Sequence, residues 1–271
     1  MNLVNGVESD AISVRDRGLA YGDGVFRTFT LRGGKPLSWQ RQHAKLTTDC
    51  KALHIVCPAA QIFERDLALI AARQPDCVVK IIVTRGSSPR GYGIPAEATQ
   101  TRIVSAGPLP DYPQRYYDRG VRVHMCRVRL AAQPALAGIK HLNRLENVLA
   151  RSEWNDPEIA EGLLCDADGN VICGTMTNLF LVKDGALLTP DLARCGVAGV
   201  QRERVLELAQ ANKIPTRIAS VSIDELLAAA ELFLVNSVIG VWPIAALDRK
   251  TWSAGPMTAL IRRWLNDAQD C

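Results

Sequence analysis

Lys140 stands in the setting of this sequence that most favours covalent chemistry. It lies in the apolar stretch 136–142, directly ahead of a predicted helix that starts with an Asn-x-x-Glu capping pattern at Asn143 and Glu146. The positive end of a helix dipole and apolar neighbours both favour the neutral amine, which is a nucleophile and forms Schiff bases with aldehydes. The alternative is a loop lysine that packs its alkyl chain on the surface and keeps its charge in water.

Two other segments have the composition of phosphate-binding sites. The stretch 196–201 places Gly196 and Gly199 at the start of a predicted helix, where backbone N–H groups can hold a phosphate. The pair Asn236-Ser237 follows a predicted buried strand and could supply a second set of donors. Each segment taken separately is equally compatible with ordinary helix capping.

The loop 84–93 contains Arg85 and Arg90 among glycines and follows a predicted strand, which suits the binding of a carboxylate. It lacks the Gly-Lys-Ser/Thr ending of a nucleotide-binding P-loop, and residues 22–24 lack the third glycine of a dinucleotide site. A simple turn is the alternative. No G-x-S-x-G motif is present, and His43, His54 and His124 lie where core or surface roles are expected, so the sequence does not predict a hydrolase.

Charge and length exclude several classes of protein. The 271 residues contain 32 Lys plus Arg and 28 Asp plus Glu, which gives a net charge of +4 without a block of like charge. This balance argues against nucleic-acid or anionic-membrane partners and is compatible with a small anionic ligand. No apolar run approaches the ~18–20 residues that span a bilayer, and no leader pattern is seen, so we expect a cytoplasmic protein.

The cysteines favour a reducing compartment. None of the eight belongs to a C-x-x-C pair or stands with histidine at metal-ligand spacing, so we expect no metal site. Cys77, Cys126 and Cys165 lie within apolar runs, where cysteine acts as a small apolar residue of the core.

Around these residues the sequence predicts a mixed α/β fold of two domains. We expect a smaller N-terminal domain at 1–107, a proline-rich linker at 108–119 and a larger C-terminal domain at 120–271. A short hairpin is predicted at 3–7 around the Asn5-Gly6 pair, with further turns at Asp168-Gly169 and Asp184-Gly185. Strands are predicted at 25–31, 77–84, 102–106, 121–125, 162–165, 178–182, 186–188 and 232–236. Helices are predicted after Ser38, after Pro58, from Asn143, at 199–212, at 223–230 behind a Ser222/Glu225 capping box, and near 257–266.

Taken together, the motifs resemble those of fold-type IV pyridoxal phosphate enzymes, over the chain from Leu3 to about Ile244. This family includes branched-chain and D-amino-acid aminotransferases and 4-amino-4-deoxychorismate lyases, and the segments 85–92 and 138–146 are more similar to the lyases. The resemblance is carried by the segments 15–26, 84–92, 140–146, 177–182, 189–190 and 199–200.

The resemblance implies roles for individual residues. It makes Lys140 the lysine that forms the Schiff base with pyridoxal 5'-phosphate. It implies that the cofactor phosphate is bound at two places and that three further residues face the substrate. The implied phosphate-site residues are Gly199, Val200, Gln201, Ser237 and Val238, and Asn236 is implied to form part of the pocket wall beside them. The implied substrate residues are Thr28, Arg90 and Tyr92.

Two positions depart from the family pattern. Lys45, followed by Leu46, stands where the family has an arginine that grips the phosphate; lysine supplies the charge without the bidentate fork. Cys173 stands where a glutamate normally pairs with the pyridine nitrogen, and a neutral thiol does not stabilise a pyridinium as a carboxylate does. The alternative for Cys173 is a buried filler at a strand end.

The resemblance implies a lyase that converts 4-amino-4-deoxychorismate to 4-aminobenzoate and pyruvate, a step of folate biosynthesis. Aromatisation of the ring drives this elimination, so it tolerates the weaker electron sink that Cys173 implies. The alternatives are a D-amino-acid or branched-chain aminotransferase of the same fold, and an inactive protein that only binds pyridoxal phosphate. The resemblance also implies a homodimer.

Overall fold

The computed structural model describes residues 1–267, which form two compact units. The N-terminal unit comprises Met1–Pro110 together with Ile139–Asn143, and the C-terminal unit comprises, within the described residues, Asp111–Gly138 and 144–267. The division predicted from the sequence assigned Lys140 to the C-terminal domain, whereas the structure places it in the N-terminal unit. Cys271 lies outside the described residues.

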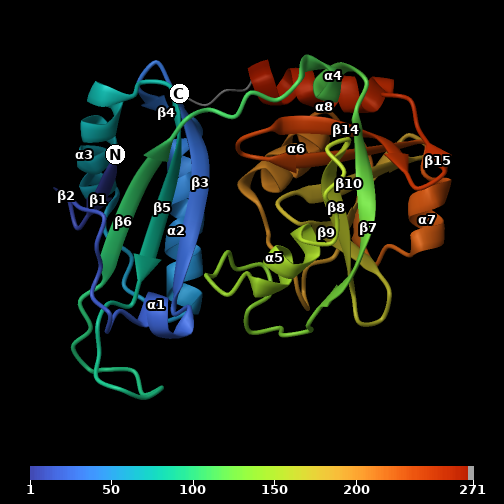
Figure 1. Ribbon diagram of the computed structural model, residues 1–271. Helices are drawn as coiled ribbons and strands as arrows, with labels where there is room; N and C mark the ends of the chain where they lie inside the picture. Colours follow the sequence, from blue (N-terminus) through green and yellow to red (C-terminus); the bar gives the residue numbers. More distant parts are fainter. Residues whose placement is uncertain (268–271) are drawn as a thin grey trace. The chain divides into compact units, whose positions relative to one another are not determined.

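The N-terminal unit is a sheet with two long helices (Figure 1). The strands follow the order β2-β1-β6-β5-β3-β4, and all the pairings within this sheet are antiparallel. The strands are β1 (Asn2–Val4), β2 (Val7–Glu8), β3 (Gly24–Arg32), β4 (Lys35–Pro36), β5 (Cys77–Thr84) and β6 (Thr101–Gly107). The helices are α1 (Arg17–Tyr21), α2 (Trp39–Ala52) and α3 (Ala60–Arg73).

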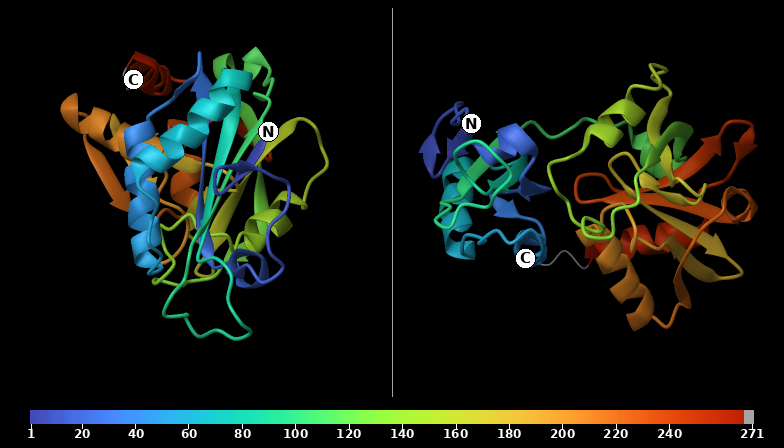
Figure 2. Two further views of the ribbon diagram at one scale, coloured as in Figure 1. Left: turned by 90° about the vertical axis from the view of Figure 1, so that its left-hand side faces the viewer. Right: turned by 90° about the horizontal axis from the view of Figure 1, so that it is seen from below.

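Alternation along the strands decides which face of this sheet is buried. Val25, Phe29 and Leu31 of β3 pack in one apolar cluster with Leu46 of α2 and Phe63 of α3. Because successive side chains of a strand point to opposite faces, Phe26 and Thr28 lie on the other face. Figure 2 shows α2 and α3 along the sheet, and the shared cluster places both on the same face.

The segment Ile139–Asn143 belongs to the N-terminal unit because it pairs with the start of β3. The N–H of Phe26 donates to the Lys140 carbonyl at 2.9 Å, and the N–H of Leu142 donates to the Gly24 carbonyl at 3.0 Å. Ile139 is 6% exposed and packs in the same apolar cluster as β3. The paired residues lie more than a hundred positions apart in the sequence, so no local sequence pattern could predict this pairing.

The C-terminal unit is built on a nine-stranded mixed sheet, in the order β12-β11-β10-β13-β14-β7-β8-β9 with β15 on β14. Its strands are β7 (Val121–Leu130), β8 (Ile159–Asp166), β9 (Val171–Gly174), β10 (Asn178–Lys183), β11 (Ala186–Pro190), β12 (Thr216–Ala219), β13 (Glu231–Asn236), β14 (Gly240–Leu247) and β15 (Lys250–Thr251). Its helices are α4 (Gln114–Asp118), α5 (Leu145–Arg151), α6 (Val200–Ala211), α7 (Ile223–Ala228) and α8 (Pro256–Asp267).

Most predicted elements are confirmed, but two of the predicted helix caps are wrong. The Ser222/Glu225 capping box is present at α7. Ser38 precedes α2 as predicted, yet its backbone has φ 53° and its side chain makes no capping bond. The Asn143/Glu146 pattern does not form a box either, because Glu146 accepts from the N–H of Ala131 instead. The helix after Pro58 begins only at Ala60.

Within the described residues, seven cysteines are free thiols, and Cys57 is the one that is not fully buried. The same part of the chain holds no helix with the length and apolarity needed to cross a membrane. It also holds no group of three or more His, Cys, Asp or Glu side chains arranged for a metal ion.

Candidate active site

Lys140 projects onto the face of the N-terminal sheet that the long helices do not cover. Its Nζ lies 4.4 Å from the centre of the Phe26 ring. Ile139 is buried in the core on the opposite face, so the alternation of the paired segment directs Lys140 away from it. The helix predicted to begin at Asn143 starts at Leu145 and has 7 residues. The position of Lys140 is therefore set by strand pairing rather than by a helix dipole.

Asp49 of α2 holds the main chain at Lys140. This carboxylate is 1% exposed, and it accepts from the Arg27 guanidinium, from the Lys45 amine and from the N–H of Lys140 at 3.2 Å. Lys45, which we expected to bind a phosphate, is thus in an ion pair with Asp49, four residues along the same helix. Burial lowers the pKa of Arg27 to about 10.

Thr28 lies two residues beyond Phe26 on β3 and is half-buried, on the same face as Lys140. Lys80 Nζ also lies on this face, 5.0 Å from the Phe26 ring centre. The Lys140 amine, the Thr28 hydroxyl and the charged Lys80 side chain therefore share one face of the sheet. This composition suits an anionic substrate bound beside a nucleophilic amine.

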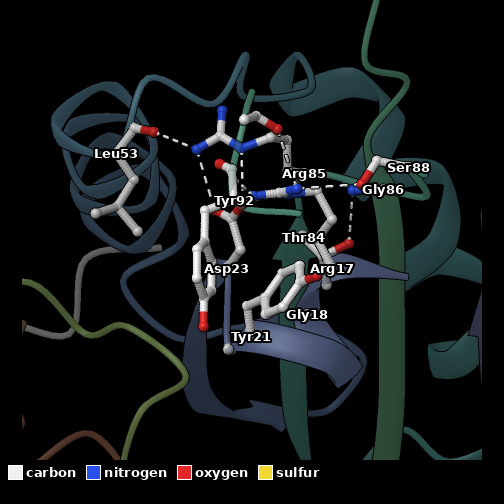
Figure 3. Close-up of polar contacts among 12 residues, drawn as sticks. Arg17, Gly18, Tyr21, Asp23, Leu53, Thr84, Arg85, Gly86, Ser88 and Tyr92 are labelled. Carbon is white, nitrogen blue, oxygen red and sulfur yellow. Dashed lines mark hydrogen bonds and ion pairs between the residues drawn. The ribbon is translucent and has the colours of Figure 1, made fainter. Parts of the chain in front are cut away.

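The loop that carries Arg90 and Tyr92 is fastened to the N-terminal unit by Arg17 (Figure 3). The Arg17 guanidinium donates to the carbonyls of Gly91 at 3.0 Å, of Tyr92 at 3.3 Å and of Gly93 at 3.3 Å. Both predicted substrate side chains are exposed, and Tyr92 is 85% exposed with its ring 5.2 Å from that of Tyr21.

Asp23 joins two buried arginines behind this loop. Its carboxylate accepts from Arg17 Nε at 2.7 Å and from Arg85 Nε at 2.8 Å. Burial alone would raise the pKa of Asp23, but the hydrogen bonds and charges of Arg85 and Arg17 lower it. The sequence suggested that Arg85 could bind the carboxylate of a ligand. In the structure the carboxylate that Arg85 binds is that of Asp23.

In the C-terminal unit, Gly199 stands at the start of α6, with Val200 and Gln201 in its first turn. Its N–H donates to the Asn178 side chain at 3.1 Å, and Asn178 donates in turn to the Val197 carbonyl at 2.8 Å. A Cβ at Gly199 would lie 2.3 Å from the Asn178 oxygen, so glycine is required there. The helix has 12 residues and no side-chain cap, which suits the binding of an anion at its N-terminus.

The second predicted phosphate segment forms a tight turn after β13. The Asn236 side chain accepts from the N–H of Val238 at 2.8 Å and of Ile239 at 2.9 Å, and it donates to the Met176 carbonyl at 3.2 Å. Ser237 lies between these residues and is partly exposed. The N–H of Val238 therefore already has a partner within the turn.

Cys173 is 6% exposed and packs in an apolar cluster with Ile172 and Cys195. Burial lowers the pKa of Arg144, which directly precedes α5 in the same unit. The turn after Cys173 is held by Glu161, which accepts from the N–H groups of Thr175 at 3.0 Å and Met176 at 3.1 Å.

Sequence reasoning missed Asp49, Arg17 and Glu161 as residues that position the site. Asp49 had a local signal, because it stands four residues after Lys45 on a predicted helix. Glu161 had no such signal, since its partners other than the adjacent Gly162 lie 14 to 16 residues away. Burial raises the pKa of Glu161, although the hydrogen bonds from Thr175, Gly162, Met176 and Thr177 oppose this shift.

This combination of fold and site identifies the family. The profile of amino-transferase class IV matches residues 24–247, and the chain belongs to this family.

The most informative relatives within the family are lyases. The chain is 34% identical to the aminodeoxychorismate lyase of Vibrio harveyi, over 92% of each chain. The crystal structure of 4-amino-4-deoxychorismate lyase from Pseudomonas aeruginosa superposes with a TM-score of 0.95 at 48% identity, over 100% of both chains. The branched-chain aminotransferase of Escherichia coli shares the fold, with a TM-score of 0.88 at 21% identity over 99% and 94% of the two chains.

Proposed function

We propose that this chain is a pyridoxal phosphate-dependent lyase that converts 4-amino-4-deoxychorismate to 4-aminobenzoate and pyruvate. The observation that carries the proposal is the end-to-end similarity to two proteins named as this lyase, at 34% and 48% identity. The reaction would supply 4-aminobenzoate for folate biosynthesis. The surplus of cations on the Lys140 face of the N-terminal sheet suits a substrate with two carboxylates.

The residues present fit the cofactor. Lys140 offers an amine to its aldehyde, and the start of α6 beside Gly199, which has no side-chain cap, offers the N–H groups of Val200 and Gln201 to its phosphate. We assign Ser237 and Val238 to the second phosphate contact, Asn236 to the pocket wall beside it, and Lys45 to the position of the family arginine. When bound, pyridoxal phosphate withdraws electrons from the substrate carbon that carries the nitrogen.

In this proposal the Lys140 amine removes the proton from that carbon. The bond between the ring and the enolpyruvyl oxygen then breaks with its electron pair on that oxygen, and the ring becomes aromatic. The released enolpyruvate takes up a proton at its methylene carbon and becomes pyruvate. The contact between Asp49 and the Lys140 N–H fixes the origin of the lysine side chain during the transfer. Thr28, Arg90 and Tyr92 are assigned to the substrate, and the Arg17 contacts hold the loop that carries the last two.

Cys173 favours elimination over transamination. A thiol in a buried apolar cluster gives less support to a protonated pyridine nitrogen than a carboxylate does. Elimination draws on aromatisation and asks less of the cofactor, whereas transamination requires reprotonation at the cofactor carbon.

Turnover of 4-amino-4-deoxychorismate by the purified protein tests the proposal. We expect equal amounts of 4-aminobenzoate and pyruvate. Incubation with pyridoxamine phosphate and a keto acid is the discriminating control, because only an aminotransferase consumes this form of the cofactor. Amino-acid formation without 4-aminobenzoate would replace the lyase by an aminotransferase, and binding without either activity would leave an inactive cofactor-binding protein.

The assignment of Lys140 has its own test. Borohydride reduction and peptide mapping should place the cofactor on Lys140, and label on any other lysine would overturn the assignment. Lys140→Ala should lose activity by several orders of magnitude and remain folded. For the labelling, Lys80→Ala is the matched control, because Lys80 faces the same Phe26 ring, and this variant should still carry the cofactor on Lys140.

We also propose that the enzyme is a cytoplasmic homodimer. The free thiols suit a reducing compartment. On the loop held by Arg17, the side chains of Tyr92 and Ile94 are 85% and 58% exposed. Neighbouring exposed apolar side chains are typical of surfaces that another protein chain covers, so we assign this loop to the dimer contact. Sedimentation equilibrium of the purified protein should give twice the chain mass.

A further inference from the structure

Two cysteines of the N-terminal unit meet outside the site described above. Cys50 lies in the last turn of α2, and Cys57 lies in the connection between α2 and α3. The chain turns back at the helix end, where the N–H of Ile55 donates to the Cys50 carbonyl at 2.8 Å and the Ile55 side chain is buried. This turn packs Cys57 against the apolar cluster that contains Cys50, and next to Thr47, three residues before Cys50 on α2, so that the two thiols lie within side-chain hydrogen-bond reach.

The surroundings of the pair distinguish its two sulfurs. Cys50 is fully buried, whereas Cys57 is partly exposed and can be reached from solvent. Thr47 Oγ1 lies 3.6 Å from Cys57 Sγ, and the ring of His43, anchored to the Pro58 carbonyl at 3.1 Å, also faces this sulfur.

These contacts make Cys57 the nucleophile of the pair. The hydrogen bond from Cys50 lowers the pKa of Cys57; burial opposes this shift, and Thr47 and His43 reinforce it. The contact with Cys57 and burial together raise the pKa of Cys50. A reachable thiolate beside a buried second thiol is the arrangement of a redox-sensitive cysteine with its resolving partner.

The same connection holds Arg85 in place (Figure 3). Arg85 donates to the carbonyls of Leu53 at 2.6 Å and His54 at 2.8 Å, both of which lie between the two cysteines. Arg85 is joined through Asp23 to Arg17, which fastens the loop 88–93. A change in the connection therefore has a continuous path of hydrogen bonds to that loop.

We propose that Cys50 and Cys57 form a peroxide-sensitive dithiol whose disulfide displaces the connection that holds Arg85. The Cys57 thiolate attacks one oxygen of hydrogen peroxide, the O–O bond breaks, and the hydroxide released takes a proton to become water. Cys57 is then a sulfenic acid. The Cys50 sulfur attacks the Cys57 sulfur, the S–O bond breaks, and hydroxide leaves with the Cys50 proton as a second water. Two thiols lose two electrons in total, and one peroxide gains them.

Peptide mapping of the wild-type chain tests the disulfide. Trypsin cleaves after Lys45, Lys51 and Arg65, so the disulfide would join the peptides 46–51 and 52–65. After treatment with one equivalent of hydrogen peroxide and without reductant, we expect this linked pair, and we expect dithiothreitol to separate it. Peroxide treatment that yields no linked pair, or links Cys57 to another cysteine, would overturn the proposal without any need for a variant.

Two variants and a second measurement test the path to the loop. Cys77→Ser, which removes another buried cysteine of the same unit, should still form the linked peptides, and Cys57→Ser should not. Hydrogen exchange of the 88–93 amides should become roughly tenfold faster when the wild type is oxidised, as expected for loss of one hydrogen bond. Unchanged exchange in a fully oxidised sample would refute the displacement of Arg85.

Discussion

Asp49→Asn should destabilise the N-terminal unit by about 3–5 kcal/mol, which is the cost of removing one partner from a buried ion pair. The side chains of Arg27 and Asp49 are 3% and 1% exposed, and within the described residues Arg27 Nε has no hydrogen-bond partner. The Asp49 carboxylate is therefore what offsets the cost of burying the positive charge of Arg27. Asparagine keeps an oxygen for the N–H of Lys140, so the variant removes the charge and retains that contact.

Denaturant unfolding followed by circular dichroism measures the decrease in the free energy of unfolding. Hydrogen exchange of the β3 and β5 amides assigns this decrease to the N-terminal unit. Glu8→Gln is the matched control. It breaks the ion pair of Glu8 with Arg73, whose side chains are 56% and 57% exposed, and it should cost less than about 1 kcal/mol.

A double variant separates charge from packing. Combining Asp49→Asn with Arg27→Met removes both charges and should recover most of the lost stability, because the penalty comes from the uncompensated guanidinium. The reasoning fails if Asp49→Asn costs no more than Glu8→Gln, or if adding Arg27→Met makes the protein still less stable.

Three further variants test other parts of the molecule. Arg90→Ala should weaken substrate use by roughly 2–3 kcal/mol, the scale of a charge-assisted hydrogen bond, with cofactor affinity unchanged; parallel loss of the cofactor in a binding titration would contradict this. Cys173→Glu should raise transamination of alanine more than it changes elimination, and a lower melting temperature with unchanged transamination would mean that Cys173 only fills the core. Glu153→Gln should flatten the acid side of the stability profile. Burial would raise the pKa of Glu153, but the N–H groups of Arg127 and Val128 with His124 lower it to about 2, so its contribution is present above the ordinary value of 4.5 and lost as pH falls toward 2. Unfolding curves between pH 7 and pH 2.5 would show an unchanged slope if this is wrong.

Local chemistry accounts for what could be predicted from the sequence. The Asn5-Gly6 and Asp184-Gly185 pairs adopt positive φ in their hairpins, and the strand at 77–84 has the predicted bounds. Such features depend on neighbours within a few residues, so their sequence signals are complete. Ser38 and Asn143 show the limit of such signals. Ser38 adopts a left-handed backbone and makes no capping bond, and Asn143 donates to the distant Gly22 carbonyl.

The sequence by itself determined that Lys140 lies in an apolar segment, that glycines precede the helix that begins at residue 200, and that Cys173 replaces an acid of the family pattern. Only the tertiary structure decided what holds them. Asp49 reaches Lys140 across 91 residues, and Arg85 reaches Asp23 across 62. These contacts depend on the register of β3 against β5 and on the docking of Ile139, which the whole chain determines through burial of the shared core.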